Sequence, residues 1–301
     1  MPLHLPSLNR REFLKASSAG LIVGAHQVLG KDQRAVDRDL VYLLNDTHIG
    51  EKHPPDAPVP SHLRQVVSEL VEQSTRPVCV LINGDLALHD GQPGDYRHFA
   101  QLIGPLDSAG IDTHLTLGNH DNREAFYAVL AEQRPENPPV ESRHISVVET
   151  PRANFFLLDS LEQTMVTPGT LGESQLAWLT RALDAHSDRP AIIMAHHNPR
   201  LGGDPLHFPG GLTDSAELWD VLAARAWVKA YLHGHIHDRS YAEHRGIHIL
   251  NTPATSYVAN PETSTTGWTT ARLADGGMTL TTHTTDPNHP WNGESRTLTW
   301  R

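Results

Sequence analysis

Short apolar runs along the chain end abruptly in clusters of polar residues. Five of these runs have the length and the aliphatic composition of buried strands, and turn-forming residues bound each of them. Histidine or asparagine follows each run directly or after a single glycine, so the pattern predicts five strands with polar side chains at their carboxyl ends. The predicted strands are residues 40–44, 78–82, 113–117, 191–195 and 227–232.

Helical patterns separate the predicted strands. They cover residues 61–73, 95–103, 123–133, 173–186 and 214–225. Thr170 and Glu173 have the spacing of a capping box at the start of the fourth helix. Alternation of strand and helix is typical of an α/β fold, in which ligands bind at the carboxyl ends of the strands.

After residue 237 the pattern becomes rich in β-strand signals and poor in helix. The predicted segments are 248–252, 268–273, 278–283 and 296–300. We expect them to complete a second sheet that packs on the first, with a loop from Asp286 to Ser295.

The polar clusters at the strand ends combine carboxylate, amide and imidazole groups, with no thiolate. This donor set suits Zn, Mn or Fe. The groups outnumber the ligands of one tetrahedral ion, whereas two ions about 3.5–4 Å apart are accommodated if one carboxylate bridges them. The candidate residues are Asp46, His48, Asp85, Asn119, His120, His196, His197, His235 and His237.

The sequence HGHIH occupies residues 233–237. In an extended chain alternate side chains lie on one side, so His233, His235 and His237 are expected to face one small space. His233 precedes the other two and is assigned to packing around the site rather than to metal binding.

Composition limits the classes of function. The chain has 301 residues, which is enough for one large domain or two small ones. Its net charge of −11 argues against broad binding to nucleic acid or to an anionic membrane surface. Cys79 is the only cysteine, which excludes an intrachain disulfide, and its apolar neighbours predict that it is buried.

The N-terminus resembles a twin-arginine export signal. Residues 10–15 read RREFLK, and a short, mildly apolar stretch from Ala16 to Ala25 follows. That stretch is shorter than the roughly 20 residues needed to span a bilayer. We expect residues 1–25 to be a signal peptide that directs export to the periplasm or the medium. The alternative is a basic N-terminal helix that arose by chance.

The five polar blocks together resemble the calcineurin-like metallophosphoesterases. The blocks are Asp-x-His, Gly-Asp, Gly-Asn-His-Asp, a pair of histidines and Gly-His-x-His, in this order, from residue 46 to residue 237. The resemblance implies an α/β fold, namely a four-layer αββα sandwich with two mixed β-sheets. It places the phosphoesterase domain at residues 38–285, followed by a C-terminal tail or strand at 286–301.

The resemblance also implies a dinuclear site and a role for each matching residue. A hydroxide that bridges the two ions would attack phosphorus in line. His120 would stabilise charge or protonate the leaving oxygen, and Asp121 would orient His120 or a metal ligand. The first ion would be bound by Asp46, His48 and His237, the second by Asn119, His196 and His235, with Asp85 bridging them.

This sequence departs from two other branches of the family, and these differences narrow the resemblance to one branch. Leu88 stands where purple acid phosphatases carry a tyrosinate ligand. The arginine that follows Gly-Asp in serine/threonine protein phosphatases is missing, and Asp121 replaces their glutamate. The stretches GDYRHFAQLI, GNHDNREAF, ESQLAWL, HHNP and HGHIH are similar to the bacterial class III cyclic-nucleotide phosphodiesterases and their glycerophosphodiesterase relatives.

These features predict an exported metallophosphoesterase that hydrolyses small phosphodiesters of the cyclic-nucleotide or glycerophosphodiester type. A phosphomonoesterase that scavenges phosphate is the alternative within enzymes. A non-catalytic scaffold that binds a partner is the alternative outside them. Scaffolds of that kind lose metal ligands, whereas Asn119, His120 and His196 are all present, which favours the enzyme.

Overall fold

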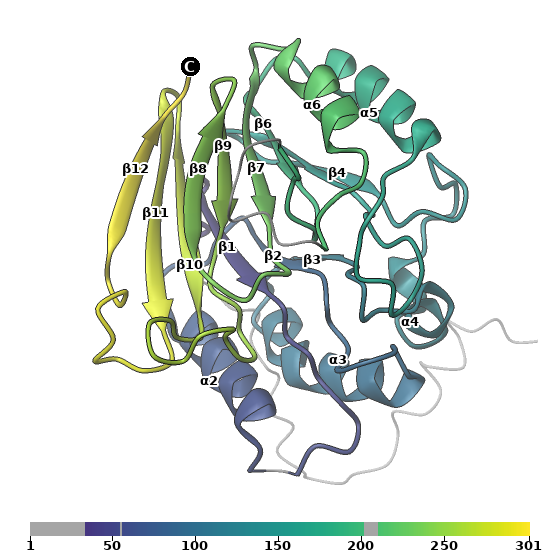
Figure 1. The fold of residues 1–301 in the computed structure, drawn as a ribbon. Helices are drawn as coiled ribbons and strands as arrows, with labels where there is room; N and C mark the ends of the chain where they lie inside the picture. The colour runs from purple at the N-terminus through teal and green to yellow at the C-terminus, as the bar shows by residue number, and fades with distance from the viewer. Residues whose placement is uncertain (1–33, 55, 202–209) are drawn as a thin grey trace, which may run out of the picture. The chain divides into compact units, whose positions relative to one another are not determined.

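The computed structural model describes residues 34–54, 56–201 and 210–301 (Figure 1). The predicted signal peptide, residues 1–25, lies outside the described residues. No helix within the described ranges has both the length and the apolar character that crossing a membrane requires.

The first of two six-stranded sheets holds the strands nearest the N-terminus and the C-terminus of the described chain. Its order is β12-β11-β10-β1-β2-β3, with β1, β2 and β3 parallel and the remaining pairs antiparallel. The strands are β1 (Leu40–Asn45), β2 (Cys79–Asn83), β3 (Thr113–Thr116), β10 (Gly267–Ala274), β11 (Gly277–Thr284) and β12 (Ser295–Thr299).

The second sheet is built from the middle of the chain. Its order is β4-β5-β6-β7-β9-β8, in which β5, β6, β7 and β9 are parallel and the outer strands β4 and β8 are antiparallel. The strands are β4 (Ser146–Glu149), β5 (Asn154–Leu157), β6 (Ala191–Met194), β7 (Val228–His233), β8 (Ser240–His244) and β9 (Ile247–Asn251).

Three apolar cores among the described residues define four layers. The central core joins inner faces of both sheets, for example Leu43 of β1 with Met194 of β6. Each outer face packs against helices in a core of its own. The first sheet packs on α2 (Pro58–Glu72), α3 (Pro93–Ser108) and α4 (Arg123–Val129). The 3-10 helix η1 (Ala131–Gln133) follows α4. The second sheet packs on α5 (Glu173–Ala185) and α6 (Ser215–Ala223).

The apolar runs are continuous because both faces of the central strands are buried. In β1, Val41 and Leu43 belong to the core between the sheets, whereas Tyr42 and Leu44 belong to the core beneath the helices. A strand with both faces covered needs apolar residues at every position. The predicted αββα sandwich with two mixed sheets is confirmed.

The predicted capping box at Thr170 is wrong. Helix α5 begins at Glu173 itself, and Gly172 occupies the N-cap with a φ of 79°. The amides of Leu171 and Gly172 donate instead to the carboxylate of Asp214, which precedes α6. A side chain distant in sequence thus satisfies the amides just before the helix.

Candidate metal centre

The candidate ligands meet where strands of both sheets end. Asp46 and Asp85 follow β1 and β2 of the first sheet, and His196 and His235 follow β6 and β7 of the second. Backbone and side-chain contacts join the two sets, since Asn83 Nδ2 donates to the Ala195 carbonyl at 3.2 Å. The seven predicted metal ligands are all buried.

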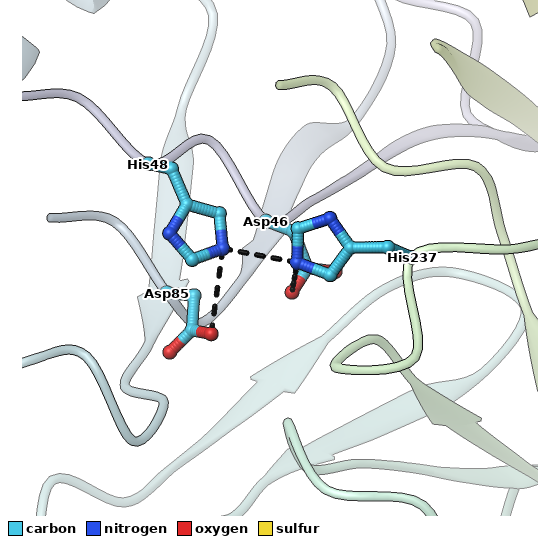
Figure 2. Close-up of side chains that lie close together, drawn as sticks. All are labelled: Asp46, His48, Asp85 and His237. Atoms are coloured by element: carbon cyan, nitrogen blue, oxygen red, sulfur yellow. Dashed lines mark hydrogen bonds and ion pairs between the residues drawn. The ribbon is translucent and has the colours of Figure 1, made fainter. Parts of the chain in front are cut away.

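The ligand atoms form two groups that share one carboxylate. The first contains Asp46, His48, Asp85 and His237, and the second contains Asp85, His196 and His235. Within each group the atoms lie within 4.8 Å of one another. In Figure 2 the side chains of Asp46 and His48, from the segment after β1, point toward those of Asp85 and His237, from two other segments.

The shortest distances converge on imidazole Nε2 atoms. His48 Nε2 lies 3.0 Å from His237 Nε2 and 3.5 Å from Asp85 Oδ2. His196 Nε2 lies 3.2 Å from the same Asp85 oxygen, and His237 Nε2 lies 3.5 Å from Asp46 Oδ1. Asp85 is therefore placed to bridge the two groups.

Backbone carbonyls set the orientation of three imidazole rings. Nδ1 of His48 faces the Leu88 carbonyl at 3.3 Å, Nδ1 of His196 faces that of Asn83 at 3.2 Å, and Nδ1 of His237 faces that of Tyr257 at 2.9 Å. A ring whose Nδ1–H donates to a carbonyl keeps its Nε2 lone pair for a cation. All three rings thus present Nε2 to the cluster.

The backbone is strained at the same residues. Non-glycine residues with positive φ are uncommon, and such conformations cost roughly 1–3 kcal/mol where the surrounding structure imposes them. Five of the candidate ligands adopt them, whereas only three other non-glycine residues in the described chain do so. The five are Asp46 (50°), His48 (46°), Asp85 (45°), His235 (70°) and His237 (50°).

Two glycines of the motifs allow the ligands to approach closely. A Cβ at Gly118 would lie 2.2 Å from Asp85 Oδ1, and one at Gly234 would lie 2.5 Å from Asp46 Oδ2. Both distances are far below van der Waals contact. The glycines before Asn119 and His235 are therefore required by packing against carboxylates of the site.

The donor set fits metal cations. Asn119 is buried, and its Oδ1 accepts no hydrogen bond from the described residues. A buried amide oxygen without a donor is costly unless a cation or water meets it. Carboxylate, amide and imidazole donors together suit divalent ions of borderline softness.

Two histidines of the site have opposite pKa shifts. Burial lowers the pKa of His48 to about 3, so its ring is neutral at neutral pH and can bind a cation. Burial also disfavours the charged form of His196, but the carboxylates of Asp85 and Asp46 outweigh it and raise the pKa of His196 to about 9. A cation bound beside His196 would take over the role of that proton.

His120 stands at the edge of the two ligand groups and is partly exposed. Its amide donates to Asp85 Oδ1 at 2.8 Å, and its ring meets that of His48 edge-on with centroids 5.0 Å apart. Nδ1 faces the His89 carbonyl at 2.8 Å. The His89 carbonyl therefore orients the ring, which leaves Nε2 for a substrate.

The three histidines of HGHIH do not share one space, and the prediction from an extended chain is wrong. Strand β7 ends at His233, and the next residues turn with positive φ at His235 and His237. His237 belongs to the first ligand group and His235 to the second, whereas His233 belongs to neither. The turn, not the two-residue period of a strand, aims each side chain.

His197 also lies outside both ligand groups. Its ring packs 4.6 Å from that of His235, and its Nδ1 lies 2.8 Å from Ser160 Oγ. It is buried, and its ring packs against the His235 ligand of the second group. Although His197 is among the candidate residues of the polar clusters, the family resemblance assigns it no role as a ligand.

Two charged residues near His120 have structural partners. The Arg123 guanidinium makes a bidentate ion pair with buried Asp159, with Nε 2.6 Å from Oδ2 and Nη2 2.8 Å from Oδ1. Asp121 was expected to orient His120 or a ligand, but its carboxylate accepts the amides of Leu86, Ala87 and Gly118. These hydrogen bonds of Asp121 link the loop after β2 to the loop after β3.

Replacement of Asp121 by alanine is expected to lower the free energy of unfolding by at least about 3 kcal/mol. The change leaves the three backbone amides without an acceptor and removes the carboxylate to which the Tyr96 hydroxyl donates at 3.1 Å. Each unsatisfied buried group costs roughly 1–3 kcal/mol. Urea unfolding measures the loss, with exposed Asp107→Ala as control, and a difference below about 1 kcal/mol would contradict this role.

Sequence patterns missed Tyr257, which lies against the first ligand group. Its ring stacks on that of His237 with centroids 4.2 Å apart and an angle of 26° between the planes. The residue follows β9 in a loop, and no motif of the chain marked it. Only the fold brings it to the site.

Known proteins of one family are similar to this chain over the region that carries the motifs. The model of the calcineurin-like phosphoesterase family matches residues 40–239. The 3′,5′-cyclic adenosine monophosphate phosphodiesterase CpdA of Pseudomonas aeruginosa is 30% identical over 73% of this chain and 76% of its own length. CpdA of Escherichia coli K12 is 32% identical over 68% and 73%, respectively.

Solved structures share the fold at lower identity. A dimetal phosphatase from Danio rerio superposes with a TM-score of 0.66 at 17% identity, covering 87% of this chain and 99% of its own. A purple acid phosphatase from yellow lupin gives a TM-score of 0.59 at 16% identity, covering 87% of this chain and 53% of its own. At such identities the likeness concerns the fold alone.

Proposed function

The chain belongs to the calcineurin-like phosphoesterase family and is a metal-dependent phosphoester hydrolase, and from that premise we propose that it hydrolyses phosphodiesters with two metal ions. The observation that carries the proposal is the position of Asp85 in both groups of ligand atoms. One carboxylate common to two clusters is what a dinuclear site needs. Bound ions would supply Lewis acidity, which activates water and polarises phosphoryl oxygens.

The residues that would hold the ions are those of the two clusters, together with Asn119. Asp46, His48 and His237 would bind the first ion, and Asn119, His196 and His235 the second. Mn, Fe and Zn all suit this set. The carbonyls behind His48, His196 and His237 orient their rings in advance, so little reorganisation accompanies binding.

His120 would act on the substrate directly. Its Nδ1 faces the His89 carbonyl, so Nε2 is the atom that can hold a proton for the leaving oxygen. A positioned imidazole can donate a proton to a leaving oxygen. The contact of Nδ1 with the His89 carbonyl therefore leaves Nε2 of His120 as the atom that holds the proton for the leaving oxygen.

Small phosphodiesters are the proposed substrates. Relatives named as cyclic-nucleotide phosphodiesterases support this class. The net charge of −11 adds a physical reason, because a phosphomonoester carries more negative charge near neutral pH than a diester and is repelled more strongly.

The diester preference is tested with bis(p-nitrophenyl) phosphate and p-nitrophenyl phosphate. We expect kcat/KM to be about tenfold or more higher for the diester, which corresponds to about 1.4 kcal/mol. Added salt should reduce the ratio of kcat/KM between the diester and the monoester, because it screens the charge of the protein. A higher kcat/KM for the monoester would favour the phosphate-scavenging alternative.

We also propose that the protein is exported by the twin-arginine route, and the support is the RREFLK sequence at residues 10–15. Replacing Arg10 and Arg11 together by lysine is expected to retain the protein in the cytoplasmic fraction of a bacterial host that has this route. Arg181→Lys, at an exposed position, is the control. An unchanged distribution between the cell fractions would rule out this signal.

A further inference from the structure

Several exposed apolar side chains are carried by segments that adjoin the candidate metal centre. Among the described residues, five large apolar side chains are prominently exposed, namely Val36, Leu88, Met165, Val166 and Tyr257. All but Val36 lie in segments attached to the site, and we call these four residues the apolar collar. Exposed apolar groups beside a ligand site offer a surface to the apolar part of a ligand.

Hydrogen bonds attach the apolar collar to the site. The Leu88 carbonyl faces Nδ1 of His48, and the Met165 amide donates to the Asn119 carbonyl at 2.7 Å. The Tyr257 carbonyl faces Nδ1 of His237 at 2.9 Å. The segments that orient candidate ligands therefore also carry exposed apolar side chains.

Tyr257 is the aromatic member of the apolar collar. Its ring stacks on His237 at 4.2 Å and lies 5.1 Å from that of His48. The side chain nevertheless remains 45% exposed. In the described part of the chain its hydroxyl makes no hydrogen bond, so packing on the two histidines leaves much of the tyrosine side chain open to a ligand.

The backbone on both sides of Tyr257 is fixed. The amide of Thr255 donates to the Asn45 carbonyl at 2.8 Å, and that of Ser256 donates to the Asp46 carbonyl at 3.1 Å. Beyond Tyr257, the amide of Ala259 donates to the His237 carbonyl at 3.0 Å. The ring is therefore held in place before any ligand arrives, which lowers the entropic cost of binding.

We propose that Tyr257 determines substrate specificity by stacking on a planar aromatic group of the phosphate ester, such as a nucleobase. This inference rests on the proposed function, because the phosphate would bind at the adjacent ligand groups. Stacking on an aromatic side chain strengthens binding of a base by about tenfold or more. Esters of glycerol have no planar group and would gain nothing from the ring.

A matched pair of ligands isolates the contribution of the base. The 5′-deoxy-5′-phosphonates of adenosine and of ribose differ at C1′, where the first carries adenine and the second a hydroxyl, and their carbon–phosphorus bond is not a substrate for ester hydrolysis. Their dissociation constants are measured by calorimetry with the full chain loaded with Mn²⁺. We expect the adenosine phosphonate to bind about tenfold more tightly than the ribose phosphonate.

Two variants test the role of the ring. Tyr257→Leu should reduce the ratio of the two dissociation constants to within about twofold, whereas Tyr257→Phe, which keeps the ring, should preserve it. Equal binding of both ligands by the native protein, or a ratio unchanged in Tyr257→Leu, would overturn the inference. Binding needs no turnover, so a base preference that depends on Tyr257 would stand even if diester hydrolysis failed.

Discussion

Replacement of Asp85 by asparagine is expected to lower kcat for diester hydrolysis by about 10³-fold or more. Asp85 is buried and belongs to both ligand groups. Its carboxylate lies 3.5 Å from His48 Nε2 and 3.2 Å from His196 Nε2, and it accepts the amide of His120. An amide in its place has one oxygen and no negative charge, so it cannot serve two cations.

The metal content of the Asp85→Asn protein is measured beside its activity on bis(p-nitrophenyl) phosphate. We expect the variant to bind fewer ions per chain than the native protein. Asp107→Asn makes the same chemical change at an exposed position of α3 and should change neither quantity. Native metal content together with kcat within about tenfold of native would contradict the bridging role.

Replacement of His120 by asparagine is expected to affect substrates unequally. General acid catalysis by a positioned imidazole contributes roughly 10²–10⁴-fold. For cyclic AMP, whose leaving group is an alkoxide, we expect kcat to fall within that range. For bis(p-nitrophenyl) phosphate the fall should be about tenfold or less, because p-nitrophenolate leaves without a proton.

The comparison between the two substrates is the decisive measurement for His120. A purely structural role would lower both rates by the same factor. His244→Asn, at an exposed position of β8, serves as the control. Equal losses on both substrates, with native metal content, would assign His120 to positioning or charge stabilisation rather than to proton transfer.

The strands of the site could be predicted from the sequence because they are buried on both faces. Runs such as residues 40–44 and 78–82 are apolar at every position, and β1 and β2 begin and end within one residue of them. Strands β4 and β8 were missed because they lie at edges of the second sheet and are partly exposed, so their patterns are mixed. β5 was also missed, although it is buried throughout.

Motif order named six residues whose ligand atoms the fold groups together, but it did not predict their geometry. The period of an extended strand misplaced the HGHIH histidines, since positive φ at His235 and His237 reverses the chain there. The roles of Asp121 and Tyr257 depend on contacts between segments distant in sequence, which no local pattern records.

The most direct test of the account is a titration of the full chain with Mn²⁺ after chelation and dialysis. Bound ions per chain are counted as hydrolysis of bis(p-nitrophenyl) phosphate is followed, with Asn119→Ala in parallel. The account predicts that activity rises until two ions are bound per chain, and that Asn119→Ala, which loses a ligand of the second ion, stays nearly inactive. Full activity with one ion per chain, or with none, would contradict the dinuclear site.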